Sequence, residues 1–370
     1  MSNFSTHPCI LFVTPEVALM PERGGNRTNF ISANAAGFSE FLAELISNLF
    51  ELGAHVHVAQ PDFRKVFADG SLKEKSGVSV KLPCDRVHLA EDRAIFYSKP
   101  ISSNSEWENI KISLAFQREV INQIIPRVQP DFIHCYDWMT GLIPAAAKKN
   151  GIPCLFTVQK FDTARSLLSC VEDIGIDAAG FWQNLYYDRY PGSYEQTRDT
   201  NPLDLLLSGI LAASHVNTAS PLLLPNIAEG RSDYSYSPLG QVLAQKWKAG
   251  CACEIPNPPH TGLNASVFKK QDCSYRPKDH RAGNQKNDSA KGPSISSPDS
   301  PTTAKWYIDL YETILQRPLV TLENKKVNPI NKNSRTKASG DRATSYPKAH
   351  ITKSYPLPNG RISPAAMAPL

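Results

Sequence analysis

The sequence predicts an α/β protein with a Rossmann-like parallel sheet and flanking helices, followed by a disordered tail. Two strand–helix–strand patterns, within residues 10–59 and 131–158, support this fold class. Parallel strands need a crossover connection of this kind, usually a helix. The third observation is a change in composition after about residue 264, where apolar anchors become rare.

The first unit begins with the apolar run ILFVT at residues 10–14. Apolar residues then recur at helical spacing over 38–50, and Gly53 ends this predicted helix. Residues 56–59 form the second predicted strand. The crossover makes this strand parallel to the first one.

The second unit carries the candidate site. A predicted strand over 132–136 ends in a polar cluster that includes His134 and Asp137, and a helix over 140–149 leads to a buried strand over 154–158. In open α/β sheets, ligands bind at the carboxyl ends of the strands. The sequence therefore places titratable groups at the edge of the sheet where chemistry would occur.

Further along the chain, residues 165–215 are expected to be mainly helical, and residues 216–220 to form another strand. Residues 269–304 are polar and proline-rich, so they cannot bury enough apolar surface to offset their chain entropy. The amphipathic run KWYIDLYETILQR follows and can form one docked helix. The predicted division is a globular domain (1–264), a disordered linker (265–304), a docking helix (305–320) and a disordered basic tail (321–370).

The charge distribution bears on the class of partner. The net charge of +5 is carried by the residues after 264, because residues 1–264 are mildly acidic. No aromatic or arginine arrangement there resembles a nucleic-acid module, so nucleic acid is not an expected partner. No apolar run approaches the roughly 20 residues of a membrane span, and the first residues lack the pattern of a secretory signal. The sequence thus predicts a cytoplasmic protein that does not enter a membrane.

The cysteines and histidines do not predict a metal site. Most of the eight cysteines stand singly on predicted strands or helices, where free cysteine packs as a small hydrophobe. Cys251 and Cys253 form a C-x-C pair, but no second pair follows at zinc-finger spacing. His55 and His57 alternate along a predicted strand and are interpreted as surface or core positions. Neither a metal nor a cofactor is predicted.

Three motifs resemble those of glycogen and starch synthases, the retaining glycosyltransferases that use ADP-glucose. They are ILFVTPEVA at 10–18, HCYDWMTGLIPA at 134–145 and SGILAASHVNTASP at 208–221. They occur in the family's order, and the resemblance covers residues 9–260. It implies the N-terminal half of a GT-B fold, in which two Rossmann-like domains face each other across a cleft. ADP-glucose and an α-1,4-glucan are the implied substrates.

The resemblance also implies roles for individual residues. Asp137, His134 and Trp138 match the family's sugar-site segment. The family's K-x-G-G-L signature maps to residues 34–38 and not to Gly24-Gly25, because only Gly37 has the family's distance to the glycine that ends the helix.

Two positions depart from the family's pattern. On this mapping Asn34 replaces the lysine that offers a positive charge to phosphate. Gln159 replaces a histidine beside the sugar, and glutamine cannot relay a proton near neutral pH. Both changes weaken the expected chemistry.

A larger departure follows residue 260, where the family continues into its nucleotide-binding domain. Here a polar segment leads instead to residues 305–320, which look like the family's last helix. We therefore expect weak or absent glucosyl transfer. The alternatives are a non-catalytic module that binds glucan or an intact synthase through an exposed half-cleft, self-association through the same surface, and a degenerate gene product.

Overall fold

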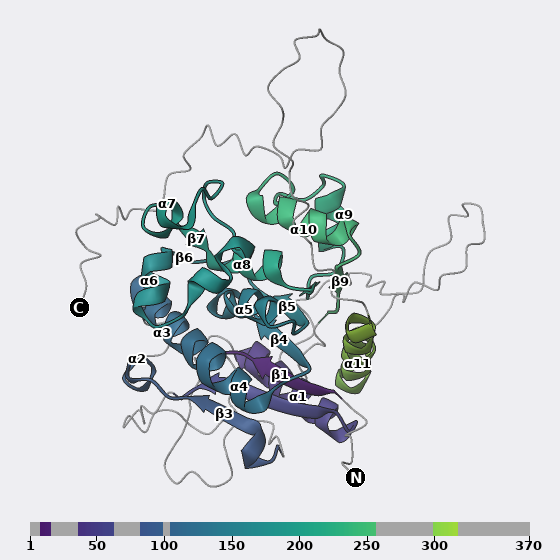
Figure 1. Ribbon diagram of the computed structural model, residues 1–370. Coiled ribbons are helices and arrows are strands. Elements are labelled where there is room, and N and C mark those ends of the chain that lie inside the picture. The colour runs from purple at the N-terminus through teal and green to yellow at the C-terminus, as the bar shows by residue number, and fades with distance from the viewer. Residues whose placement is uncertain (1–7, 16–35, 63–81, 99–103, 257–298, 317–370) are drawn as a thin grey trace. The chain divides into compact units, whose positions relative to one another are not determined.

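The computed structural model describes residues 8–15, 36–62, 82–98, 104–256 and 299–316 (Figure 1). Asn34, residues 265–298 of the predicted linker, the last four residues of the predicted docking helix (317–320) and the predicted tail (321–370) lie outside these ranges. Among the described residues, no helix is both long enough and apolar enough to cross a membrane. The domain boundaries given above stay predictions.

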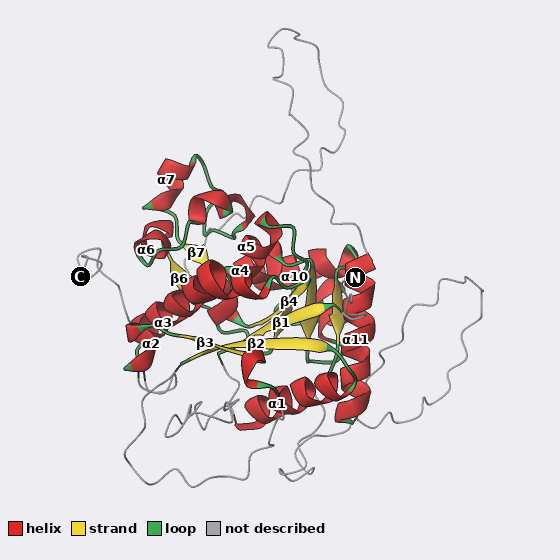
Figure 2. Ribbon diagram, turned by 60° about the horizontal axis from the view of Figure 1, so that its bottom comes forward, coloured by secondary structure: helices red, strands yellow, loops and turns green. Residues whose placement is uncertain are grey.

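The core of the fold is a seven-stranded sheet in the order β3-β2-β1-β4-β5-β8-β9. All six strand pairs of this sheet are parallel, so the predicted Rossmann-like fold class is confirmed (Figure 2). The strands are β1 (Cys9–Val13), β2 (His55–Pro61), β3 (Val87–Ala90), β4 (Phe132–Tyr136), β5 (Cys154–Val158), β8 (His215–Thr218) and β9 (Ala252–Glu254).

The order of the strands contains one reversal. From β1 the chain moves outward to β2 and β3, and then it crosses back to place β4 on the other side of β1. From β4 it moves outward in the opposite direction through β5, β8 and β9. The carboxyl ends of β1 and β4 therefore flank the topological switch point, where open α/β sheets bind their ligands.

Helices cover both faces of the sheet. One face packs against α1 (Ala36–Glu51) and α11 (Ser300–Gln316), which also contact each other. The other face packs against a second group of helices. These are α3 (Glu106–Glu119), α4 (Ile125–Val128), α5 (Ile143–Lys149), α8 (Leu205–Ala212), α9 (Leu223–Ala228) and α10 (Pro238–Lys248). Both faces are apolar because each is covered.

Helix α11 is joined to the sheet by aromatic side chains. Ala304, Tyr307, Tyr311 and Ile314 follow a spacing of three or four residues, so they share one face of the helix, and all four are buried. The Tyr307 hydroxyl accepts a hydrogen bond from Nδ2 of Asn217 on β8 at 3.0 Å. The helix thus combines apolar burial with polar contacts to the middle of the sheet.

The region 165–215 departs from the mainly helical prediction. It holds the short helices α6 (Leu168–Asp173) and α7 (Tyr194–Arg198) as well as α8, but also an antiparallel pair formed by β6 (Arg165–Ser166) and β7 (Leu203–Asp204). The remaining described elements are short helical segments: η2 (Cys84–Arg86), α2 (Arg93–Phe96), η4 (Val120–Ile124), η5 (Trp138–Thr140), η6 (Ala178–Gly180) and η7 (Trp182–Asn184).

Candidate functional site

A pocket of about 300 Å³ lies at the switch point of the sheet. Its lining includes Thr14 and Pro15 directly after β1, Asp137 and Trp138 directly after β4, and Lys160 just after β5. The volume is at the lower end of the range for small-molecule sites. Three neighbouring parallel strands therefore deliver polar groups to one cavity, as the rule for open sheets predicts.

Asp137 is the best-defined side chain of this pocket. Its Oδ1 accepts hydrogen bonds from the backbone N–H groups of Gln159 at 2.7 Å and Lys160 at 3.2 Å. Its own N–H donates to the carbonyl of Thr157 at 3.1 Å. The Asp137 carboxylate thus ties the loop after β4 to the loop after β5 and fixes the wall of the pocket.

The backbone at Asp137 is strained. Its φ of 55° and ψ of −179° lie in a region that is essentially reserved for glycine. Such a conformation costs about 1–3 kcal/mol and persists where the surroundings enforce it, most often at ligand sites. The turn leads directly into the 3₁₀ segment η5, and the carboxylate is directed toward the loop after β5.

The lining mixes charges of both signs. Glu106 at the start of α3, Asp137 and Asp162 supply carboxylates, and Lys160 supplies an ammonium group. Carboxylates accept hydrogen bonds from sugar hydroxyls, and an ammonium group attracts phosphate. The pocket can therefore hold a hydroxyl-rich ligand, with Lys160 as a positive group among several carboxylates.

The other residues predicted for the site occupy different positions. Trp138 lines the pocket beside Asp137. Gln159 contributes its backbone N–H to Asp137, and its side chain is partly exposed. Gly37 lies in the first turn of α1. The structure thus brings Asp137, Trp138 and the Gln159 backbone together.

His134 lies outside the lining of the pocket. Its ring is fully buried on the face of the sheet that α11 covers. Nε2 lies 2.7 Å from the Thr157 hydroxyl, and Nδ1 lies 2.8 Å from the Tyr311 hydroxyl of α11. Side chains alternate along a strand, and this register turns His134 into the core with Tyr136.

Burial gives His134 a measurable effect on stability. Desolvation holds the pKa of its folded form well below the ordinary 6.5, so the folded protein keeps the ring neutral. Below about pH 6.5 the unfolded chain binds a proton that the folded protein does not, so stability falls as the pH falls, by up to about 1.4 kcal/mol per pH unit. Urea unfolding at pH 7.5, 6.0 and 5.0 measures this slope.

The variant His134→Gln removes the titrating group and keeps a polar side chain near Thr157 and Tyr311. We expect a shallower loss of stability between pH 6.5 and 5.0 than in the unmodified protein. Equal slopes in the two proteins would show that His134 contributes nothing to acid unfolding.

Several pocket residues were missing from the sequence prediction. Thr14 and Lys160 obey the same carboxyl-end rule as Asp137, so that rule, applied to the strands at 10–14 and 154–158, would have found them. Glu106 and Asn109 come from α3, and nothing in the sequence alone points to their position at the pocket.

The parallel sheet defines an α/β domain of the Rossmann-like class, and the pocket at its switch point is a candidate ligand site. Comparison with known families makes the assignment specific. The family described as the starch synthase catalytic domain matches residues 9–236, which is more than half of the chain. The chain therefore belongs to the starch synthase catalytic domain family, a glycosyltransferase family related to the glycogen synthases.

Bacterial glycogen synthases are similar in sequence. The glycogen synthase of Moorella thermoacetica is 30% identical over 155 residues, which cover 38% of this chain and 29% of that protein. Glycogen synthase 1 of Synechococcus sp. (strain JA-2-3B'a(2-13)) is 31% identical over 125 residues, 31% of this chain and 23% of that protein. The matched region thus spans less than a third of the length of either relative.

A solved structure is similar as well. The catalytic domain of starch synthase IV from Arabidopsis thaliana, bound to ADP and acarbose, aligns with 15% sequence identity and a TM-score of 0.47. The alignment covers 68% of this chain and 52% of the plant chain.

Proposed function

We propose that this chain carries the acceptor side of a glucosyl-transfer site, with ADP-glucose as donor and the end of an α-1,4-glucan as acceptor, in the cytoplasm. The observation that carries the proposal is the Asp137 carboxylate, which is fixed by two backbone N–H groups in a pocket at the switch point. A carboxylate held in this way can accept hydrogen bonds from sugar hydroxyls without first reorganising.

We further propose that transfer by this chain is weak. Glucosyl transfer needs stabilisation of a leaving phosphate as well as of the sugar. Asn34, at the position of the family's lysine, carries no positive charge, and Gln159 cannot relay a proton near neutral pH. Only residues 257–298 separate the end of the described core from α11. This segment is too short to hold the second domain of the family. The division into domain, linker, docking helix and tail belongs to this proposal.

A second candidate function is glucan binding without transfer, and an aromatic pair favours it. The ring centroids of Phe161 and Tyr234 lie 4.7 Å apart. Phe161 directly follows the pocket residue Lys160 in the sequence. Tyr234 is 40% exposed and Tyr236 is 84% exposed. Exposed aromatic faces are suited to stacking on sugar rings. Binding to an intact synthase or self-association through this surface are the other partner proposals.

Two assays on the purified chain separate these functions. The first measures incorporation of radiolabelled glucose from ADP-glucose into glycogen, and the second measures co-sedimentation with glycogen. We expect co-sedimentation with little or no incorporation. Incorporation at a rate typical of enzymes, about 1 per second or more, would contradict weak transfer. Failure of both assays would contradict the proposed function itself.

A further inference from the structure

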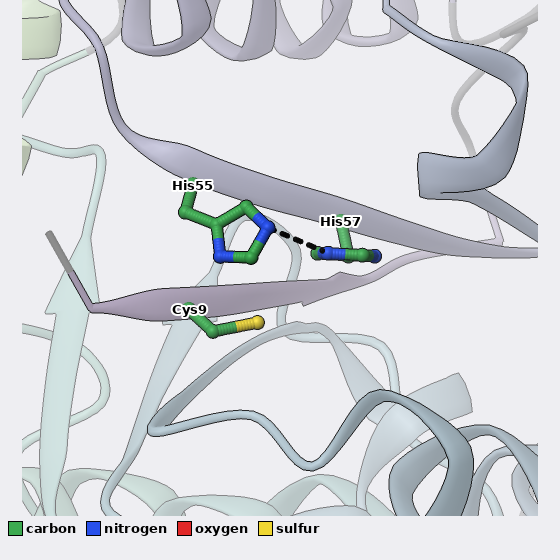
Figure 3. Close-up of side chains that lie close together, drawn as sticks. All are labelled: Cys9, His55 and His57. Carbon is green, nitrogen blue, oxygen red and sulfur yellow. Dashed lines mark hydrogen bonds between the residues drawn. The ribbon is translucent and has the colours of Figure 1, made fainter. Parts of the chain in front are cut away.

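Three possible metal ligands meet at the amino ends of two neighbouring strands. Cys9 begins β1, His55 begins β2, and the register of the sheet pairs these two residues. His57, two residues further along β2, points to the same face of the sheet. The Cys9 Sγ and one nitrogen of each ring all lie within 4.8 Å of one another (Figure 3).

The distances between these atoms fit a tetrahedral zinc site. The Nε2 atoms of His55 and His57 are 3.3 Å apart. Two nitrogens bound to a tetrahedral zinc ion at about 2.0–2.1 Å are separated by about 3.3 Å. In the same geometry a zinc-bound sulfur lies about 3.5 Å from each nitrogen. The Cys9 sulfur, now within 4.8 Å of the two nitrogens, therefore has to move toward them by little more than about 1 Å.

We propose that Cys9, His55 and His57 bind one zinc ion, with water as the fourth ligand. A donor set of one thiolate and two imidazoles favours zinc over the hard cations magnesium and calcium. This proposal replaces the interpretation of His55 and His57 as plain surface or core positions. The spacing of the histidines alone could not show the site, because Cys9 comes from a different strand.

His88 on β3 supplies the outer contact that a zinc-bound histidine usually makes. Nδ1 of His57 lies 2.9 Å from Nε2 of His88, and the two rings stack with an interplanar angle of 13°. When zinc occupies Nε2 of His57, Nδ1–H donates to His88 and fixes the orientation of the ring. The exposed Arg127 lies 3.3 Å from the other nitrogen of His88 and can move away when that nitrogen carries the proton.

The charge states favour metal binding at the two histidines and oppose it at the cysteine. Burial, with a contribution from His88, lowers the pKa of His57 to about 4, so its ring is neutral and offers a lone pair near pH 7. Burial also lowers the pKa of His55. Burial and the nearby Asp131 raise the pKa of Cys9 to about 11, so the thiol must release its proton when it binds the ion.

The location of the cluster separates it from the proposed reaction. Cys9 and His55 stand at the amino ends of their strands, whereas the pocket lies at the carboxyl ends. A zinc ion there would join β1 to β2 and hold the first strand of the sheet in place. Its role is therefore structural, and this inference does not depend on the proposed glucan chemistry.

A cobalt titration of the purified full chain tests the proposal, because cobalt(II) replaces zinc and is coloured. We expect one ion per chain, with intense visible bands typical of tetrahedral coordination and a near-ultraviolet band from the thiolate. Added zinc should abolish both signals. The variant Cys9→Ser should lose the thiolate band. The variant His55→Asn should weaken cobalt binding about hundredfold or more, which exceeds the usual effect of removing a residue that only hydrogen-bonds to a metal ligand.

The matched control is Cys170→Ser, which removes another partly buried free thiol. Its cobalt spectrum should equal that of the unmodified chain. Circular dichroism of each variant without metal establishes that the fold is retained. A thiolate band that persists in Cys9→Ser, or that disappears in Cys170→Ser, would overturn the assignment, as would the absence of stoichiometric binding by the unmodified chain.

Discussion

Replacing Tyr307 with alanine is expected to lower the free energy of unfolding by about 3–5 kcal/mol, the usual cost of truncating a large buried aromatic side chain. Tyr307 is fully buried between α11 and the sheet, and its hydroxyl contacts Asn217 on β8. The alanine variant loses the packing of the ring and leaves the Asn217 amide without this contact. Urea unfolding followed by circular dichroism measures the difference.

Two further variants divide this effect. Tyr307→Phe keeps the ring and removes only the hydroxyl, so we expect a cost of about 1–2 kcal/mol. Tyr190→Ala removes an aromatic side chain that is 92% exposed, and it should change stability by no more than about 0.5 kcal/mol. If Tyr307→Ala costs no more than Tyr190→Ala, the packing of α11 on the sheet does not contribute to the stability of the domain.

The long central strands could be predicted from the sequence, and the edge strands could not. The strands predicted at 10–14, 132–136 and 154–158 correspond to β1, β4 and β5, each an apolar run buried on both faces. β3 and β9 contain four and three residues, and each pairs on one side only. Their sequences, VHLA and ACE, contain no continuous apolar run, so the pattern does not separate them from loops.

The site could be predicted only where the position along a strand was sufficient. Asp137 follows the last residue of β4, so the carboxyl-end rule places it at the end of the strand that borders the pocket. His134 required knowledge of which face of the sheet its ring occupies and what covers that face. Its partner Tyr311 is 177 residues away in the sequence, and no local pattern records that contact.

The same limit applies to the proposed zinc site. His55 and His57 could be seen to share one face of a strand, as alternate residues do. That Cys9 joins them follows only from the register between β1 and β2. Long-range pairing thus determines both the burial of His134 beneath α11 and the grouping of Cys9 with His55 and His57.

Replacing Asp137 with alanine should have the second large effect. The variant loses both hydrogen bonds to the backbone of Gln159 and Lys160, and a hydrogen bond to a charged group contributes about 1.5–3 kcal/mol. Alanine also tolerates a φ of 55° with a ψ near 180° poorly. We expect a loss of about 3–5 kcal/mol in the free energy of unfolding and no binding to glycogen.

The variant Asp137→Asn separates stability from ligand binding. The amide oxygen of asparagine can still accept from both N–H groups, so the loop connection is kept and the loss of stability should be about 1 kcal/mol. The negative charge that strengthens hydrogen bonds from sugar hydroxyls is absent, and co-sedimentation with glycogen should weaken about tenfold. The alanine and asparagine variants both lack the negative charge, but only the alanine variant loses the loop connection. If a folded Asp137→Asn variant binds glycogen as well as the unmodified chain, the carboxylate only stabilises the pocket wall. The acceptor contact would then have to be sought at Glu106 or Asp162, the other carboxylates that line the pocket.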